Sequence, residues 1–198
     1  MKRWELRFTG YGGQGVITAG LIFGRAACIH AGLDVVMYES YGPEITGGFS
    51  RADLVISDTT IEYPLVSQAD ILIAFSKNAY ETDRASLKAG GLLLAERDLV
   101  PLPPDEQEKI QVCRVAAVDA ADELGRRVVA NIVLLGALAE VTDIVPADAV
   151  ERAILDRVPK GTERLNLEAF HRGQALAAAE ADPHNLGPDL VDQASEVQ

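Results

Sequence analysis

Near its start the chain reads Gly10-Tyr11-Gly12-Gly13-Gln14-Gly15, and this stretch decides the fold. Residues 4–9 before it alternate apolar and polar side chains, a pattern typical of a short β-strand. Residues 16–31 after it are mostly apolar and predict a helix. Glycine permits positive φ and a close backbone approach, so the stretch predicts a tight turn between strand and helix. The free N–H groups at the start of such a helix suit a phosphate or a carboxylate.

The spacing of Gly10, Gly12 and Gly15 matches G-x-G-x-x-G, the fingerprint of a dinucleotide-binding turn. That fingerprint also requires an acidic residue at the end of the next strand, and Glu39 follows the strand predicted at residues 35–38. A stand-alone NAD(P)-binding Rossmann oxidoreductase therefore fits this part of the chain. The glycines fit equally well a turn that only packs helix on sheet, with Glu39 in solvent. Both interpretations stay open on these residues alone.

A second glycine-rich segment follows, Ser40-Tyr41-Gly42-Pro43-Glu44-Ile45-Thr46-Gly47-Gly48-Phe49-Ser50-Arg51. It connects the strand at 35–38 with another predicted at 52–57. We expect this loop at the carboxyl end of the sheet, where ligand and partner sites of α/β folds gather. A long connection of ordinary turn residues is the alternative, but loops of this length more often serve a function.

Beyond this loop the chain continues to alternate between strand and helix patterns. Strands are predicted at residues 71–75, 92–94 and 110–115, with a short extended segment at 61–64 as a hairpin partner. Helices are predicted at residues 79–87, ended by Gly90 and Gly91, and at 128–141, 147–157 and 166–180. The order predicts an α/β fold, a Rossmann-like three-layer α/β/α arrangement with a mainly parallel sheet and a helical C-terminal part.

Length and composition fit one domain of this kind. The chain has 198 residues, of which 48% are hydrophobic, so residues 1–180 are expected to form a single domain and residues 181–198 a flexible or partner-bound tail. The net charge of −12 argues against nucleic acid or an anionic membrane as partner. No apolar run is long enough for membrane insertion, and the start lacks a signal-peptide pattern. We expect a cytoplasmic protein.

The chain offers no catalytic or metal-binding set of its own. Its three histidines, His30, His171 and His184, are scattered and lack metal-ligand spacing. Cys28 lies in a predicted helix and Cys113 in a predicted strand, and both are expected to be buried. Two cysteines are too few for an iron–sulfur cluster or a structural zinc site. We therefore predict no catalytic residue and no metal ligand within this chain alone.

With its two glycine-rich segments the chain resembles the gamma subunit, or gamma domain, of the 2-oxoacid:ferredoxin oxidoreductase family. Residues 7–15 meet the pattern Arg-x-x-Gly-x-Gly-Gly-Gln-Gly, residues 40–44 meet Ser-Tyr-Gly-Pro-Glu, and residues 47–50 meet Gly-Gly-x-Ser. The resemblance covers about residues 4–178, including a C-terminal Asn-Leu-Glu-Ala-Phe at 166–170. One position departs from it: many members carry arginine where this chain has Thr46. Any anion contact of that arginine is therefore in doubt here.

The resemblance implies an enzyme complex. Such a complex oxidatively decarboxylates a 2-oxoacid to acyl-CoA and passes the electrons to ferredoxin or a similar acceptor. The family resemblance places thiamine diphosphate, Mg²⁺ and [4Fe-4S] clusters on partner subunits, with CoA as co-substrate. It implies that this chain binds no cofactor wholly by itself and is inactive alone. Pyruvate, 2-oxoglutarate, branched-chain and aryl oxoacids all fit this class.

The resemblance also suggests which residues meet a cofactor, CoA or a partner. They are Gly12, Gly13, Gln14, Gly15, Tyr41, Glu44, Gly47, Gly48, Ser50 and Arg51. Of these, Arg51 is the best candidate for contacting an anion or a carboxylate of a neighbouring subunit. The alternative is a purely structural glycine turn in a chain that serves as a non-catalytic assembly scaffold.

Overall fold

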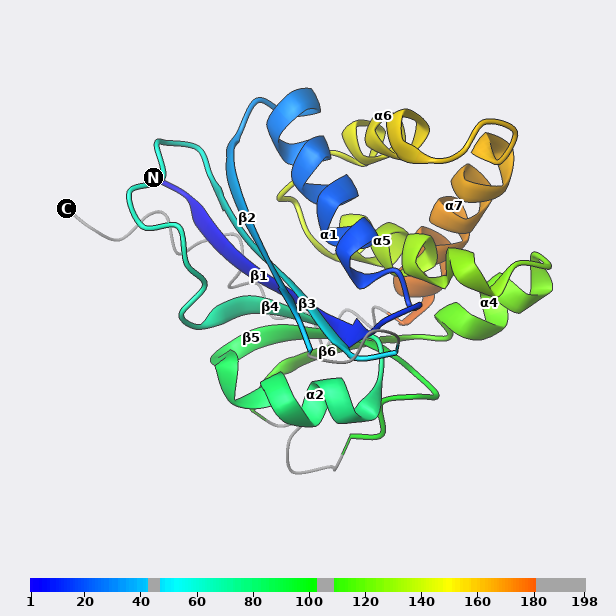
Figure 1. Ribbon diagram of the computed structural model, residues 1–198, viewed down its shortest axis with the longest axis horizontal. Helices are drawn as coiled ribbons and strands as arrows, with labels where there is room; N and C mark the ends of the chain where they lie inside the picture. The colour runs from blue at the N-terminus through cyan, green and yellow to red at the C-terminus, as the bar shows by residue number, and fades with distance from the viewer. Residues whose placement is uncertain (43–46, 103–108, 181–198) are drawn as a thin grey trace.

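A computed structural model describes residues 1–42, 47–102 and 109–180 (Figure 1). The strands are β1 (Arg3–Tyr11), β2 (Asp34–Tyr41), β3 (Phe49–Ser57), β4 (Ala69–Ala74), β5 (Leu87–Glu96) and β6 (Gln111–Val115). The helices are α1 (Val16–Arg25), α2 (Lys77–Asp83), α4 (Ala117–Glu123), α5 (Ala130–Val141), α6 (Ala147–Arg157) and α7 (Glu163–Glu180). A π-helical turn, Ala26–His30, extends α1, and 3₁₀ turns follow α2 (Arg84–Ser86) and precede α5 (Arg127–Val129).

These strands form one sheet in the order β2-β3-β1-β4-β5-β6. The pairs β1–β4, β4–β5 and β5–β6 are parallel, whereas β3 runs antiparallel to both β1 and β2. Every strand except β3 therefore runs in the same direction, which confirms the predicted mainly parallel sheet. The pairing also brings the end of β1 beside the start of β3, because antiparallel neighbours meet end to start.

Helices cover both faces of the sheet, as predicted for a three-layer α/β/α fold. Helices α1, α5, α6 and α7 lie on one face and α2 on the other (Figure 1). The C-terminal part of the described chain is helical, which was also expected. No helix among the described residues is long and apolar enough to span a membrane.

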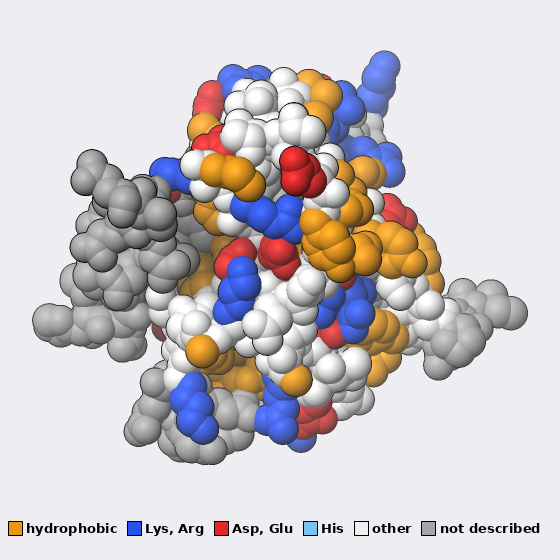
Figure 2. Space-filling view, turned by 90° about the vertical axis from the view of Figure 1, so that its left-hand side faces the viewer, with side chains coloured by type: hydrophobic (Ala, Val, Ile, Leu, Met, Phe, Trp, Pro, Cys, Tyr) orange, Lys and Arg blue, Asp and Glu red, His pale blue; other side chains and the backbone are white. Residues whose placement is uncertain are grey.

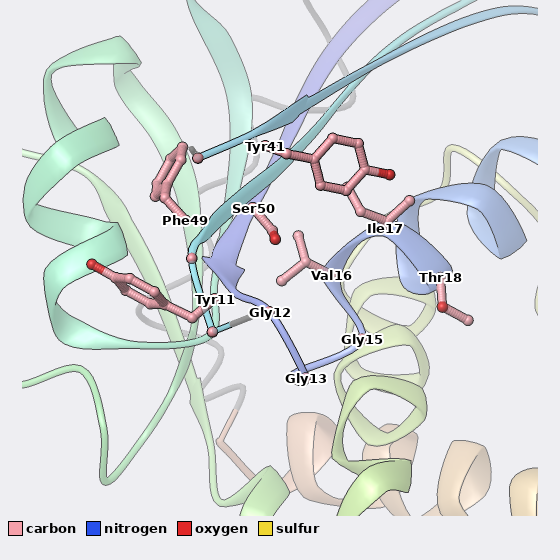
Figure 3. Close-up of a pocket in the computed structure, with 13 residues that line it drawn as sticks. Tyr11, Gly12, Gly13, Gly15, Val16, Ile17, Thr18, Tyr41, Phe49 and Ser50 are labelled. Atoms are coloured by element: carbon pink, nitrogen blue, oxygen red, sulfur yellow. The ribbon is translucent and has the colours of Figure 1, made fainter. Parts of the chain in front are cut away.

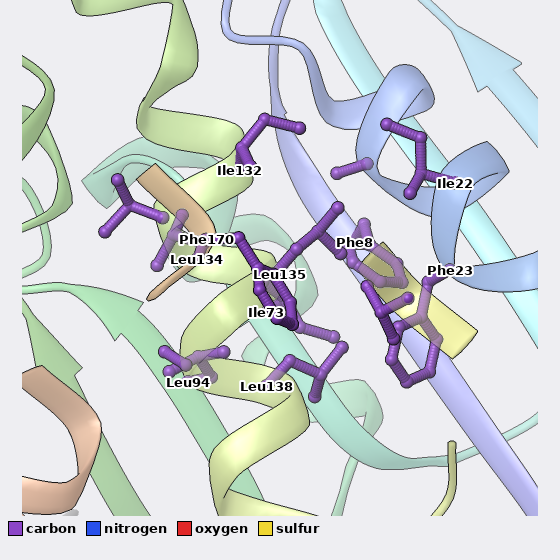
Figure 4. Close-up of a cluster of buried hydrophobic side chains, with 14 of the residues drawn as sticks. Phe8, Ile22, Phe23, Ile73, Leu94, Ile132, Leu134, Leu135, Leu138 and Phe170 are labelled. Carbon is purple, nitrogen blue, oxygen red and sulfur yellow. The ribbon is translucent and has the colours of Figure 1, made fainter. Parts of the chain in front are cut away.

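The main core lies between the sheet and the α1/α5 layer (Figure 4). Phe8 of β1, Ile73 of β4 and Leu94 of β5 are buried there against Leu135 and Leu138 of α5. Helix α5 is apolar all round because the sheet covers one side and α7 the other. Burial of each large apolar side chain stabilises the folded state by about 1.5–3 kcal/mol. This layer is therefore the main stabilising element.

The surface is mixed in charge. Figure 2 shows acidic and basic side chains side by side on the face that it presents, with hydrophobic side chains scattered between them. The exposed large hydrophobic side chains include Tyr41 at the end of β2 and Val128 beside the start of α5. Such isolated apolar side chains are ordinary on a protein surface.

Several predictions about elements were wrong. Gly90 and Gly91 do not end a helix; they lie within β5, where the register with β4 shifts and forms a bulge. Residues 61–64 form no strand, and the seven-residue helix α4 was not predicted. Cys28 is exposed rather than buried, because the π-helical turn directs Ala26 and Ala27 inward instead. Cys113 is buried in β6 as expected.

Residues 181–198, predicted to be a tail, lie outside the described residues, so the expected division at residue 180 stays a prediction.

Candidate functional site

The two glycine-rich segments meet at one end of the sheet. Tyr11, the last residue of β1, is paired in register with Phe49, the first residue of β3. Just beyond this pair the N–H of Gly12 donates a hydrogen bond to the carbonyl oxygen of Gly48, at 2.7 Å. A Cβ atom on Gly12 would lie 3.1 Å from the backbone nitrogen of Gly47. Glycine at position 12 therefore allows the two backbones to approach.

The turn after β1 is held by side chains as well as by glycine. Gly15 precedes α1 in the left-handed conformation, with φ +75°. A Cβ atom there would lie 2.5 Å from Nδ2 of Asn131, a nearly buried residue that donates to the carbonyl oxygen of Gly15. Gln14 accepts a hydrogen bond from the N–H of Tyr11 (2.7 Å) and donates one to the carbonyl oxygen of Phe75 (3.2 Å). Gln14 thus ties the turn to the end of β4.

A cavity of about 540 Å³ opens between the two segments and the start of α1 (Figure 3). Its wall is formed by Tyr11, Gly12, Gly13, Gly15, Val16, Ile17, Thr18, Tyr41, Gly42, Gly47, Gly48, Phe49 and Ser50. Seven of the predicted site residues are brought together here: Gly12, Gly13, Gly15, Tyr41, Gly47, Gly48 and Ser50. Below, we call this space the glycine-loop cavity.

The described residues that line the glycine-loop cavity are uncharged. The ring of Tyr41 lies on the same side as Val16 and Ile17, whereas the rings of Tyr11 and Phe49 point to the other side of the strands (Figure 3). Val16, Ile17 and Thr18 form the first turn of α1, whose N–H groups have no acceptor within the helix. The helix start favours an anion, so the cavity suits a ligand with a phosphate and an apolar body. Among the described residues that line it, there is no histidine, cysteine or carboxylate for acid–base or nucleophilic chemistry.

Tyr41 and Glu39 contact each other at the mouth of the cavity. The hydroxyl of Tyr41 donates to a carboxylate oxygen of Glu39 at 2.5 Å, and this hydrogen bond raises the pKa of the Tyr41 phenol. The dinucleotide fingerprint instead requires the acidic residue on a strand that directly neighbours β1. Here β3 lies between β1 and β2, so the geometry differs from that of a Rossmann NAD(P) site.

Two predicted site residues lie away from the cavity. The Gln14 side chain braces the turn, as described above, and faces a second cavity of about 270 Å³ on the other side of it. Arg51 pairs with Asp83 of α2 on the opposite face of the sheet, with Nε 3.2 Å from Oδ2 and Nη2 bonded to Oδ1. Its guanidinium also lies 5.2 Å from the centre of the Phe49 ring. The carboxylate partner of Arg51 is thus within this chain.

Sequence reasoning missed Asp83. The signal was present but weak: Ala79, Tyr80 and Asp83 share the buried side of α2, at the spacing of a helix face. Two positions singled out in the sequence, Glu44 and Thr46, lie outside the described residues.

The chain is similar to known proteins over most of its length. Residues 5–176 match the family described as pyruvate ferredoxin/flavodoxin oxidoreductase. The 2-oxoglutarate synthase subunit KorC of Methanocaldococcus jannaschii is 43% identical over 176 residues, which cover 88% of this chain and 94% of that protein.

Solved structures agree with these sequence matches. A keto/oxoacid ferredoxin oxidoreductase gamma subunit from Geobacter sulfurreducens is 41% identical with a TM-score of 0.81, and the match covers 91% of this chain and 99% of that one. A 2-oxoglutarate:ferredoxin oxidoreductase from Magnetococcus marinus was solved with 2-oxoglutarate, coenzyme A and succinyl-CoA bound. It is 29% identical with a TM-score of 0.82, and the match covers 92% of this chain but only 32% of that longer chain.

Proposed function

The chain belongs to the pyruvate ferredoxin/flavodoxin oxidoreductase family, and we propose that it is the gamma subunit of a multi-subunit enzyme that converts a 2-oxoacid to acyl-CoA. Residues 5–176 carry the family match in one continuous span. The similarity to a separate gamma subunit over nearly its whole length supports a chain that works as one subunit among several. The identity to a 2-oxoglutarate synthase subunit makes 2-oxoglutarate the proposed oxoacid.

The redox cofactors of this reaction are assigned to partner subunits. Thiamine diphosphate with Mg²⁺ would supply the decarboxylation chemistry, and iron–sulfur clusters would carry electrons to ferredoxin or a similar acceptor. The donor set here does not fit a cluster, which needs about four cysteines. Cys28 is exposed at a helix end and Cys113 is buried in β6. Among the described residues, no three His, Cys, Asp or Glu side chains gather as a metal site would require. We accordingly expect the chain to be inactive alone.

The proposed role of this chain is to receive part of CoA at the glycine-loop cavity and to present it to the catalytic subunits. The observation that carries this proposal is the first turn of α1, which opens into a cavity whose named lining has no competing charge. The helix start would hold a phosphate of CoA, and the ring of Tyr41 with the side chains of Val16 and Ile17 would contact its apolar parts. The Magnetococcus marinus relative has coenzyme A bound, which is consistent with this role.

A charge reversal at the helix start tests the proposal. Thr18 lines the cavity, is exposed, and is the third residue of α1, where glutamate is compatible with the helix. In the purified complex, Thr18→Glu should raise the KM for CoA about fivefold to tenfold, because like charges placed together cost about 1 kcal/mol. The kcat should change little. Thr18→Gln has nearly the same size without the charge and should leave the KM near the unsubstituted value.

A non-catalytic assembly role remains the second candidate, because packing alone accounts for one of the glycines. Gly15 is required by its positive φ and by Asn131, whether or not a ligand binds. If the chain were only a scaffold, Thr18→Glu and Thr18→Gln would both leave the KM for CoA unchanged in an intact complex. A rise in KM with glutamate alone would exclude that role.

A further inference from the structure

Asp83 is hydrogen-bonded to both strands that carry the glycine-rich segments, but it does not line the cavity. It is the last residue of α2, its side chain is 2% exposed, and it faces the sheet. The hydroxyl of Thr9 donates to its Oδ2 at 2.5 Å, and Arg51 donates to both of its oxygens. Thr9 and Arg51 are themselves paired in register on β1 and β3. One carboxylate therefore holds two neighbouring strands.

The two strands are held just where each joins its glycine-rich segment. Thr9 directly precedes Gly10, where the first segment begins, and Arg51 is the last residue of the second segment. Beyond this point the two backbones are joined by the hydrogen bond between Gly12 and Gly48. Because Asp83 bonds to both strand ends, its position helps to set how closely the two segments approach.

Side-chain contacts lead from Asp83 through Arg51 to the rings of Phe49 and Tyr11. The guanidinium of Arg51 stacks on the Phe49 ring, and Phe49 meets Tyr11 edge-on, with ring centres 6.3 Å apart and planes at 88°. Phe49 and Tyr11 are among the residues that line the glycine-loop cavity, but their rings point to the other side of the strands, toward Arg51 (Figure 3). Displacing Arg51 would therefore disturb the packing of Phe49, the first residue of β3, from the face opposite the cavity.

A second ion pair on the same sheet face provides a natural comparison. Arg7 binds Asp53 through two hydrogen bonds of 2.7 and 2.6 Å, and both side chains are largely buried. Burial alone would lower the pKa of Arg7, but the hydrogen bonds and charge of Asp53 outweigh it and raise that pKa. This pair lies two residues further from the glycine segments along each strand. Arg7 also lies 4.0 Å from Asp83 (Nη1 to Oδ1), so the two pairs are neighbours, but neither Arg7 nor Asp53 belongs to a glycine-rich segment.

We propose that Asp83 is a positioning residue, which acts through Thr9 and Arg51 to hold the two glycine-rich segments at the spacing that forms the glycine-loop cavity. The carboxylate charge matters because two arginines and two aspartates balance in this cluster, so neutralising Asp83 leaves Arg51 without its counter-charge. The consequence for CoA rests on the function proposed above, whereas the consequence for the loop spacing does not.

Amide hydrogen exchange at Gly12 reports the spacing directly. Its N–H bridges the two segments, so in the full-length chain Asp83→Asn should speed Gly12 exchange about tenfold or more, as expected when a charge-assisted hydrogen bond is lost. In the purified complex the same substitution should raise the KM for CoA by a larger factor than it lowers kcat. Asp53→Asn weakens a comparable buried pair and should leave Gly12 exchange much slower than Asp83→Asn does.

The outcomes distinguish the positioning role of Asp83 from the assignment of CoA to the cavity. If Gly12 exchange is unchanged by Asp83→Asn, or is raised equally by Asp53→Asn, the positioning role is wrong. If Gly12 exchange rises while the KM for CoA stays the same, Asp83 positions the segments and the assignment of CoA to the cavity fails. Should Asp83→Asn not fold, Thr9→Val decides: it removes only one hydroxyl contact and should raise Gly12 exchange by a smaller factor. No rise with Thr9→Val would contradict the proposal.

Discussion

Position 15 requires glycine for two separate reasons. Its φ of +75° is unfavourable for other residues, and any Cβ would overlap the amide of Asn131. Gly13 has a φ of +93° but open space around it, so a substitution there costs backbone strain alone, about 1–3 kcal/mol. The cost of a substitution at Gly13 in the isolated chain thus comes from the backbone conformation and not from crowding.

The spacing of the glycines predicted the turn because turn formation depends on a few adjacent residues. The family resemblance singled out Tyr41, Gly47, Gly48 and Ser50, and the structure brings these four residues together. Sequence reasoning missed Asp83, which meets Arg51 only through the packing of α2 on the sheet. The helix-face spacing of Ala79, Tyr80 and Asp83 indicates only that Asp83 is buried, because a side-chain partner far away in sequence is set by the fold.

The two cysteines should differ sharply in reactivity. Cys28 is exposed, whereas burial, together with the negative charge of Glu180, raises the pKa of Cys113 to about 12. In the native protein one thiol should therefore react with Ellman's reagent, and the second should react only after denaturation. Two fast equivalents in the native state would contradict the burial of Cys113.

The raised pKa of Cys113 also makes stability depend on pH. An unfolded thiol ionises near its ordinary pKa of about 8.5, while the folded one stays protonated to about 12. The stabilisation is thus complete below about pH 8.5 and is lost as pH rises toward 12, with a slope of at most about 1.4 kcal/mol per pH unit. Cys113→Ala should remove this component from denaturant unfolding measured across that range, and an unchanged slope would argue against it.

At the scale of elements, helices α5 and α7 pack unusually closely through a pair of glycines. A Cβ on Gly173 would overlap the carbonyl oxygen of Val133, and one on Gly136 would overlap that of Phe170. The two helices need glycine at both positions to keep this separation. The contact holds the outer helix of the C-terminal part against the core.

The sign of the change in stability caused by Gly173→Ala tests this packing. Helix propensity alone would make alanine stabilising by about 1 kcal/mol. The overlap with the backbone of α5 should instead destabilise the protein by about 3 kcal/mol, at the upper end of overpacking costs. Denaturant unfolding of the full-length chain measures the difference, and a gain in stability would show that the helices are not packed so closely.

Elements were predictable where their pattern was long and regular. The helix expected at 147–157 has those bounds, and the apolar run at 71–75 lies within a buried strand except at its last residue. The boundary between α2 and β5 was misjudged because Gly90 and Gly91 serve equally well as a helix stop or a strand bulge. Helix α4 was missed because seven residues rich in alanine show little periodicity.

At the scale of the whole molecule, the sequence predicted layers and strand direction better than strand order. Alternating side chains identify a strand but not its neighbour, so the insertion of β3 between β1 and β2 was not foreseen. This order brings the two glycine-rich segments together and separates Glu39 from the turn after β1. The dinucleotide interpretation depended on the opposite arrangement.

We propose that this chain is a gamma subunit and works only within a 2-oxoacid oxidoreductase complex. A native pull-down of the full-length chain from its source cells, followed by an assay of 2-oxoacid- and CoA-dependent dye reduction, tests it most directly. We predict co-purification with thiamine-diphosphate- and cluster-bearing subunits, activity with 2-oxoglutarate that requires CoA, and no activity of the chain alone. A solitary chain that binds NAD(P) and has no such partners would contradict the account.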